Sequence, residues 1–374
     1  MFKKALATGL LLAICLGGVQ LMFNCEATRE ELLPLLAPVK ATGLTPHGMP
    51  VRRYYTGVGL VDDILVGIVG FFSLLVDGED EATHRFSSWF LPQLSPLLVH
   101  MYWETTRSKS RLVLFPTIFP GMLMQRWTGG VILPMYFIAS ILTSSAVPEF
   151  SRGDTVAKAR ALLPAIALGF FLPTAMLFLL PTDVPLDIKQ IIAAAWQPAP
   201  LWISIVYNVL RVVFPSARKP SEGVCQASFD AHLKSLAWVK RTYILCGIMS
   251  AVAHITILSV TMFDPSQGAL RKFLVPYTWY PYLPFEAPTS DVADYRRAIR
   301  QFFQLDWLFI TLGALVYFAY CHAATARQGK DTSLGGWLWR MGVLSVLGSP
   351  GAAFAWAAAL QEERYFALQQ EKRE

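Results

Sequence analysis

Three carboxyl groups that could do chemistry lie within or at the end of long apolar segments. Asp63 follows Asp62 in GLVDDILVGIVGFF, Glu104 ends LLVHMYWE, and Asp306 lies in FFQLDWLFI. An ionisable group at membrane depth is costly and usually faces the interior of a helix bundle, which makes it a functional candidate. Burial raises the pKa of a carboxyl group, so that it can stay protonated near neutral pH and act as a general acid. We therefore predict that Asp63, Glu104 and Asp306 include the catalytic acid.

Asp62 and Asp63 cannot share one face of a helix, because adjacent residues lie about 100° apart. One of them could cap the helix near its start, a position that favours aspartate. The aspartate that does not cap the helix could then face a cavity. Our candidate acid is Asp63, and Asp62 is a candidate substrate contact. Ile64, Leu65 and Val66 follow the pair. The pair is therefore not the DDxxD cluster that would hold magnesium and a diphosphate.

His100, Glu104 and Arg107 follow one another at i, i+4 and i+7, which places them on one face of a helix. A carboxyl group between an imidazole and a guanidinium is either a poised acid or a paired helix end. A cation beside Glu104 would lower its pKa, which favours Asp63 or Asp306 as the proton donor. As a metal site the pattern is weak, since it offers two ligands and no third. We predict no metal.

Other polar residues inside apolar blocks could bind an oxygen-bearing substrate. Gln125 stands beside Arg126, Gln197 stands between Trp196 and Pro198, and His254 lies in AVAHITI. Each has a structural alternative, because Arg126 can extend to the interface and a lone histidine is more often a hydrogen-bonded packing residue.

Aromatic residues are abundant, with 11 Trp, 13 Tyr and 24 Phe. They could face lipid and form interfacial belts. Alternatively they line a cavity, where their π faces would stabilise positive charge during carbocation chemistry. The candidate substrate-contacting residues are then Asp62, His100, Trp103, Arg107, Gln125, Trp196, Gln197, His254 and Trp307.

The composition of the chain predicts that membrane-spanning helices position these residues. The chain has 374 residues, of which 54% are hydrophobic and 16% charged, with a mean hydropathy of +0.43. Soluble domains carry about 25% charged residues, so the composition excludes a disordered chain and a coiled coil and argues against a soluble enzyme. The apolar residues fall in blocks of roughly twenty, the length that crosses a bilayer. We predict an all-α polytopic transmembrane helical bundle with about eight to ten spans.

The predicted organisation has four parts. Residues 1–23 form an uncleaved signal-anchor or signal-like span, 24–56 a polar loop, 57–360 the transmembrane helical domain, and 361–374 a polar C-terminal tail. The block at 112–126 contains two prolines and is broken or re-entrant. Within the domain the apolar blocks run at about 57–76, 87–103, 112–126, 129–147, 160–180, 190–214, 242–263, 302–324 and 335–360.

Loop charges predict orientation but conflict at the N-terminus. The loops 104–111, 148–160 and 215–241 hold 11 basic residues, against 3 in the loops that alternate with them. The positive-inside rule places the first set in the cytosol. Lys3 and Lys4 favour a cytosolic N-terminus as well, which contradicts the loop bias if every block spans. We give the loop bias more weight.

Several function classes lack their motifs. The sequence has no Walker loop, GxSxG, HExxH or GxGxxG, so ATPase, serine hydrolase, zincin and Rossmann readings have no support. Its five cysteines form no CxxC pair. No basic run is interleaved with aromatic residues as a nucleic-acid groove requires. We predict no cofactor and no nucleic-acid partner.

Five segments together resemble a fungal family of membrane-bound terpene cyclases. The family comes from meroterpenoid clusters such as the ascofuranone pathway, with related membrane proteins of paxilline-type indole-diterpene clusters. The likeness spans most of the chain after about residue 50. The segments are YTGVGLVDDILVGIVGFF, residues 102–107, residues 125–136, Trp196-Gln197-Pro198 and LAWVKRTYILCGIMSAVAHIT.

This resemblance implies protonation of a terminal epoxide or alkene on a prenyl chain, followed by ring closure through cations. The implied partners are the bilayer, in the endoplasmic reticulum, and a lipophilic prenylated small molecule. Two other classes remain open, a transporter of a lipophilic metabolite and a non-catalytic scaffold for other membrane enzymes. The absence of an internal repeat weakens the transporter reading. Acids converging on one closed pocket would favour the cyclase, and acids lining a continuous channel the transporter.

Overall fold

Helix is the only regular secondary structure in the described part of the chain. The computed structural model describes residues 2–25, 27–45, 48–77, 80–105, 117–143, 155–181, 183–214, 224–266, 268–282, 295–326 and 333–371. Within these residues the only β pairing is an isolated bridge between Leu44 and Pro50. The prediction of an all-α fold is confirmed.

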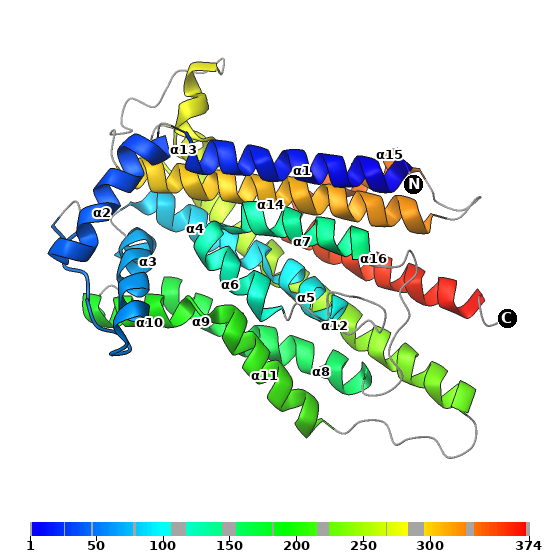
Figure 1. The fold of residues 1–374 in the computed structure, drawn as a ribbon. Coiled ribbons are helices and arrows are strands. Elements are labelled where there is room, and N and C mark those ends of the chain that lie inside the picture. The colour runs from blue at the N-terminus through cyan, green and yellow to red at the C-terminus, as the bar shows by residue number, and fades with distance from the viewer. Residues whose placement is uncertain are drawn as a thin grey trace.

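In the described residues of the first half of the chain, α1 is followed by two short elements and then by five helices (Figure 1). The bounds are α1 Phe2–Phe23, the π-helix η1 Ala27–Leu32, α2 Leu33–Thr42, α3 Gly59–Asp77, α4 Glu81–Gln93, α5 Ser95–Glu104, α6 Ile118–Trp127 and α7 Gly129–Thr143.

The second half contains the longest helices. The bounds are α8 Thr155–Ile166, the π-helix η3 Ala167–Phe171, α9 Leu172–Phe178, α10 Leu186–Trp196, α11 Ala199–Val213, α12 Val224–Met262, α13 Ala269–Leu274, the 3₁₀-helix η4 Tyr277–Tyr282, α14 Tyr295–Thr325, α15 Leu334–Leu347 and α16 Pro350–Glu371.

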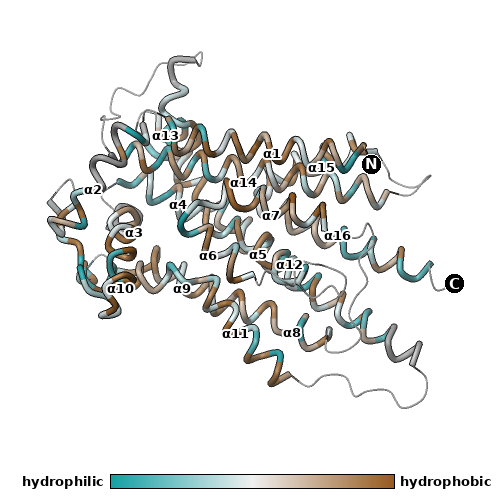
Figure 2. Tube along the Cα trace, in the orientation of Figure 1, coloured by the Kyte–Doolittle hydropathy of each residue, from teal (hydrophilic) through white to brown (hydrophobic). Residues whose placement is uncertain are grey.

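In the described part of the chain, four helical stretches are long and apolar enough to cross a membrane. They are Phe2–Phe23, Thr155–Phe178, Asp230–Met262 and Arg296–Thr325, and shorter apolar helices cover Gly129–Thr143, Ala199–Val213 and Leu334–Leu347. In the most apolar window of α14, 61% of residues are buried, against 28% in α1 and in α12. Helix α14 is therefore the central element, and α1 and α12 expose apolar faces. Figure 2 shows hydrophilic residues collecting at the ends of α12 and α16.

Helices α1, α7 and α14 pack closely because small residues lie where they cross. A Cβ at Gly18 of α1 would lie 3.4 Å from the carbonyl oxygen of Gly130 in α7, and one at Gly313 of α14 would lie 3.0 Å from Pro134. Small residues at such crossings let helix backbones approach each other, as is common in membrane proteins.

The structure places the N-terminus beside the ends of α7 and α14. Lys3 donates to the carbonyl of Ala323 in the last turns of α14, and Lys4 donates to that of Leu142 at the end of α7. The two lysines thus lie at the bundle end where α7 and α14 finish. Helix α3 lies with α2 and α10 at the opposite end and runs transverse to the long helices (Figure 1). The block predicted at 57–76 therefore does not run parallel to the long helices.

Three predicted segments differ from the observed ones. The block 335–360 is two helices, separated at Gly348 and Ser349, where the Ser349 hydroxyl caps α16 by accepting the Ala352 N–H at 2.9 Å. The predicted polar loop 24–56 contains η1 and α2. Residues 361–371, predicted as a polar tail, continue α16, because part of their polar surface is buried against the bundle.

Candidate functional site

Helix α5 places His100 and Glu104 side by side in the core. Both residues are completely buried, and His100 Nε2 lies 3.5 Å from Glu104 Oε1. The i, i+4 spacing brings the two side chains onto one face, which confirms that part of the predicted arrangement. Arg107 lies outside the described residues. The result is an acid and an imidazole in contact, away from bulk water.

Tyr317 of α14 extends this contact across three helices. Its hydroxyl lies 3.0 Å from His100 Nε2 and 3.2 Å from the hydroxyl of Ser140 in α7. The ring of Tyr317 stacks on Phe137 with centroids 4.5 Å apart. We call Ser140, His100, Glu104 and Tyr317 the α5 cluster. Hydroxyl and imidazole groups both donate and accept, so the cluster can hold and move a proton.

A second carboxyl group approaches the same helix from α16. Glu362 Oε2 accepts a 2.8 Å hydrogen bond from Trp103 Nε1, and both residues are buried. Sequence reasoning missed Glu362 because it falls in the predicted polar tail. The helical spacing of Phe354, Ala358 and Tyr365, all buried, was the signal that α16 continues its inward face past residue 360.

Aromatic rings surround the α5 cluster. The His100 ring lies 5.3 Å from Phe318, which stacks on Phe354 at 6.2 Å. A small pocket of about 10 Å³ borders Trp103 and Glu362. π faces attract positive charge, most strongly in the absence of water. The surroundings of Glu104 are therefore suited to stabilise a cation formed beside it.

Comparison with known proteins identifies the family. A family model described as the CtvD domain matches residues 9–366. The chain belongs to the CtvD family. This result confirms the resemblance to fungal terpene cyclases that the sequence segments indicate.

Curated relatives of this CtvD-family chain are named terpene cyclases. It is similar to terpene cyclase ctvD of Aspergillus terreus, with 30% identity over 59% of this chain and 64% of that protein. It is also similar to terpene cyclase ascI of Acremonium egyptiacum, with 24% identity over 70% of this chain and 66% of that protein. The matches thus span just under two thirds of these two relatives.

A third relative matches over more of its length. Terpene cyclase alnG of Emericella nidulans is 24% identical over 91% of this chain and 89% of that protein. No solved structure matches this CtvD-family chain.

Asp306 lies apart from the α5 cluster. It is buried, and its Oδ1 accepts the backbone N–H of Gly130 at 2.5 Å, in the first turn of α7. The first N–H groups of a helix have no partner within the helix, and Thr128 just before α7 has a positive φ of 69°. Asp306 therefore caps α7 from a neighbouring helix. It is eleven residues from Tyr317, or about 17 Å along α14.

The two aspartates of α3 have different surroundings. Asp62 is buried and accepts hydrogen bonds from the backbone N–H groups of Tyr55, Thr56 and Gly57 and from the Thr56 hydroxyl, at 2.7–3.1 Å. The Thr56 N–H and the other donors hold the pKa of Asp62 below its ordinary value. Asp62 thus holds the turn that precedes α3 and does not cap the first N–H groups of the helix, and Asp63 is exposed.

Trp196 and Gln197 are buried at the junction of α10 and α11. Trp196 Nε1 donates to the Thr174 hydroxyl at 3.0 Å, and the Gln197 amide donates to the Ala193 carbonyl at 3.2 Å. Gln125 is half-buried in α6. These hydrogen bonds of Trp196 and Gln197 thus lead to α9 and α10 and not to the α5 cluster.

His254 and Trp307 belong to a separate group around Trp89. His254 Nδ1 accepts from Trp89 Nε1 at 2.9 Å, and its Nε2 lies 3.2 Å from the Val346 carbonyl. Trp307 packs on Trp89 with centroids 4.9 Å apart. Both nitrogens of His254 thus have protein partners, which matches the packing alternative. Among the described residues, no three His, Cys, Asp or Glu side chains are grouped so as to hold a metal ion.

The three predicted acids therefore do not converge. Glu104 lies in the α5 cluster, Asp306 caps α7, and Asp63 is exposed on α3. Among the predicted substrate contacts that the structure describes, which leave out Arg107, only His100 and Trp103 lie beside Glu104.

Proposed function

We propose that this chain is a terpene cyclase that acts as a multi-pass protein of the endoplasmic reticulum membrane. Membership of the CtvD family and the curated names of the relatives support the cyclase activity. Four helices of spanning length support the membrane location. The proposed substrate is a lipophilic prenylated small molecule, because such a molecule dissolves in the bilayer in which the enzyme lies.

Glu104 is the proposed proton donor, and its complete burial against His100 and aromatic rings carries this assignment. A carboxyl group without access to water protonates more easily, and the rings accept the cation that its proton creates. Asp306 and Asp63 remain candidates. The first is committed to a backbone N–H and the second is exposed.

The proposed reaction moves protons and electron pairs without net oxidation. Glu104 gives its proton to a terminal epoxide oxygen, the bond from that oxygen to the more substituted carbon breaks, and the next double bond attacks the cation. Loss of a proton from carbon to the Glu104 carboxylate ends the sequence and restores the acid. With an alkene, the proton adds to carbon instead. The product is an isomer of the substrate, which makes the enzyme a metal-independent isomerase or lyase type.

His100, Tyr317 and Ser140 would orient the Glu104 carboxyl group and pass its proton. Their contacts of 3.0–3.5 Å form a connected path through the core. A path of this kind is useful because the carboxyl group must be protonated and correctly placed at the start of each turnover.

The test uses microsomes from a yeast host that expresses the chain. Linear and epoxidised prenylated phenols and indoles are supplied, and isomers of unchanged mass are sought by chromatography. We expect one isomer with the wild type, its loss in Glu104→Gln by at least about 100-fold, and its retention in Asp63→Asn and Asp306→Asn. Retention in Glu104→Gln with loss in Asp306→Asn would transfer the assignment to Asp306.

The same microsomes distinguish the alternative classes. Movement of unchanged substrate across the membrane with no isomer formed would support the transporter. An isomer that persists in all three acid variants would contradict acid initiation by these residues.

A further inference from the structure

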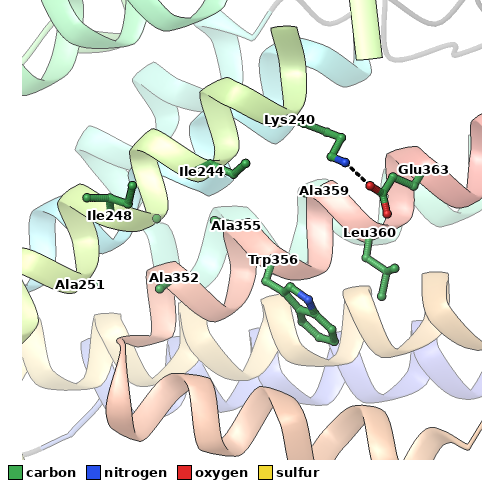
Figure 3. A pocket seen from close by; sticks show the side chains of 11 residues that line it. Lys240, Ile244, Ile248, Ala251, Ala352, Ala355, Trp356, Ala359, Leu360 and Glu363 are labelled. Atoms are coloured by element: carbon green, nitrogen blue, oxygen red, sulfur yellow. Dashed lines mark hydrogen bonds and ion pairs between the residues drawn. The ribbon is translucent and has the colours of Figure 1, made fainter. Parts of the chain in front are cut away.

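Helices α12 and α16 enclose a groove on the outward face of the bundle (Figure 3). Its volume is about 440 Å³, within the range of about 300–1,000 Å³ that small-molecule sites occupy. Gly247 and Ala251 of α12 and Ala355 of α16 form part of its floor, and Trp356 stands at its edge. Lys240 and Glu363 close one end with an ion pair. The groove is thus long, apolar along its length and polar at one end.

The groove opens where α12 exposes apolar side chains. Ile244 and Ile248 line it and are 53% and 51% exposed, in a helix long enough to span a membrane. In the proposed membrane location this face meets lipid tails. A molecule dissolved in the bilayer can therefore reach the groove by lateral diffusion, without crossing water.

Helix α16 lies between the groove and Trp103, the residue that precedes Glu104 in α5. Ala355, Ala359 and Glu363 face the groove, whereas Glu362 points inward to Trp103. Adjacent residues on a helix point about 100° apart, so the polar end of the groove and the buried carboxyl group lie on neighbouring faces of one helical turn. The residues from Ala352 to Glu363 span about 17 Å along the helix, which suits an extended chain better than a compact ring.

The polar end discriminates between head groups. Lys240 and Glu363 neutralise each other, so the end offers a donor and an acceptor without net charge. A phosphate would be attracted by Lys240 but repelled by Glu363. A neutral hydroxyl group can donate to the carboxylate and accept from the ammonium group at once. The chemistry therefore fits an alcohol or phenol on an apolar chain.

We propose that this groove binds the isoprenoid chain of the substrate as it arrives from the bilayer, with the hydroxyl-bearing end at Lys240 and Glu363. The proposal rests on the proposed function and assigns a substrate-binding site outside the α5 cluster. Small residues four apart, such as Gly247 and Ala251, also permit association of membrane helices. A second copy of the chain is therefore an alternative occupant that the test must detect.

The test is photo-crosslinking of the full-length chain in phosphatidylcholine nanodiscs. The probe is a farnesyl phenol that carries a diazirine on its chain, and labelled peptides are mapped by mass spectrometry. Ala359→Phe fills the groove, and Val252→Phe is the matched control, since Val252 is an exposed residue of α12 outside the groove. Glu104→Gln is labelled in parallel, so that binding is measured apart from turnover.

We expect labelling on α12 and α16 that falls about tenfold in Ala359→Phe and is unchanged in Val252→Phe and Glu104→Gln. Unlabelled farnesyl phenol should compete, and added phosphatidylcholine should not. Equal labelling in Ala359→Phe, displacement by phosphatidylcholine, or crosslinks between two copies at this face would each overturn the proposal. Groove labelling without isomer formation by the wild type would leave this site standing and refute the cyclase activity, so the two failures are distinguishable.

Discussion

Glu104 and Asp306 are both buried carboxyl groups in apolar helices, yet their partners differ in kind. Glu104 contacts an imidazole that connects to two hydroxyl groups on other helices. Asp306 accepts a backbone N–H at the start of α7. Asp306 also hydrogen-bonds the Thr128 side chain beside that N–H. The imidazole that contacts Glu104 can take up a proton and pass it on to two further groups, whereas the backbone N–H that holds Asp306 only donates. Burial alone therefore does not identify a catalytic acid, and the partners of the carboxyl group decide.

This comparison predicts that turnover depends on the exact position of the Glu104 carboxyl group. In the wild type, His100 lies 3.5 Å from the Glu104 carboxyl group. Glu104→Asp keeps the carboxyl group but shortens the side chain by one methylene and so withdraws it from His100. A displacement of about 1 Å at a reacting group costs about 100-fold in rate. We expect turnover to fall by about that factor while the thermal unfolding midpoint in detergent changes little. Unaltered turnover in this variant would show that Glu104 does not deliver the proton.

The stability of the fold should depend on the side-chain oxygen of Asp306 and not on its negative charge. Asp306→Asn keeps an oxygen that accepts the Gly130 N–H, so we expect near-normal stability and isomer formation per molecule. Asp306→Ala removes the cap, which typically costs about 1 kcal/mol, and should lower the unfolding midpoint. The measurement is thermal unfolding of purified protein with isomer yield per folded molecule. Loss of yield in Asp306→Asn at normal stability would reverse the comparison.

Tyr317 tests whether the α5 cluster works as a connected path. Tyr317→Phe keeps the stack on Phe137 but removes the hydroxyl group between His100 and Ser140. One buried hydrogen bond contributes about 1 kcal/mol, so we expect a several-fold lower turnover and a changed pH profile. Ser140→Ala is the matched control, since it removes the end of the path. A profile that is unchanged in Tyr317→Phe would assign Tyr317 a packing role alone.

The fold was largely predictable from hydropathy, and the features that hydropathy did not predict have a physical explanation. Apolar blocks predict helices because a buried backbone must satisfy its own hydrogen bonds. Hydropathy measures burial but not direction, so it could not show that α3 runs transverse to the bundle. It also could not place the break between α15 and α16, since Gly348 and Ser349 are small residues within an apolar run.

The candidate site was predictable only where its residues are near in sequence. Helical spacing brings His100 and Glu104 together, and this was foreseen. Tyr317 and Glu362 join them from more than 200 residues away, and nothing in local spacing encodes that meeting. The adjacent pair Asp62 and Asp63 shows the same limit, because the segment before α3 decides which one is buried.

Asp62 extends the comparison to a third carboxyl group, which holds the turn before α3 outside the proposed site. Its expected effect is the smallest. Because its pKa is lower in the folded chain than the ordinary value, it stabilises the fold above the ordinary pKa, about 3.9, and this contribution is lost as the pH falls through the folded pKa. Asp62→Asn should therefore lower the unfolding midpoint at pH 6 and less so below pH 4. Asp63→Asn, on the exposed neighbour, is the control. An equal loss in Asp62→Asn at both pH values would mean that its hydrogen bonds do not depend on charge, and Asp62 would then resemble Asp306, whose cap needs only an oxygen.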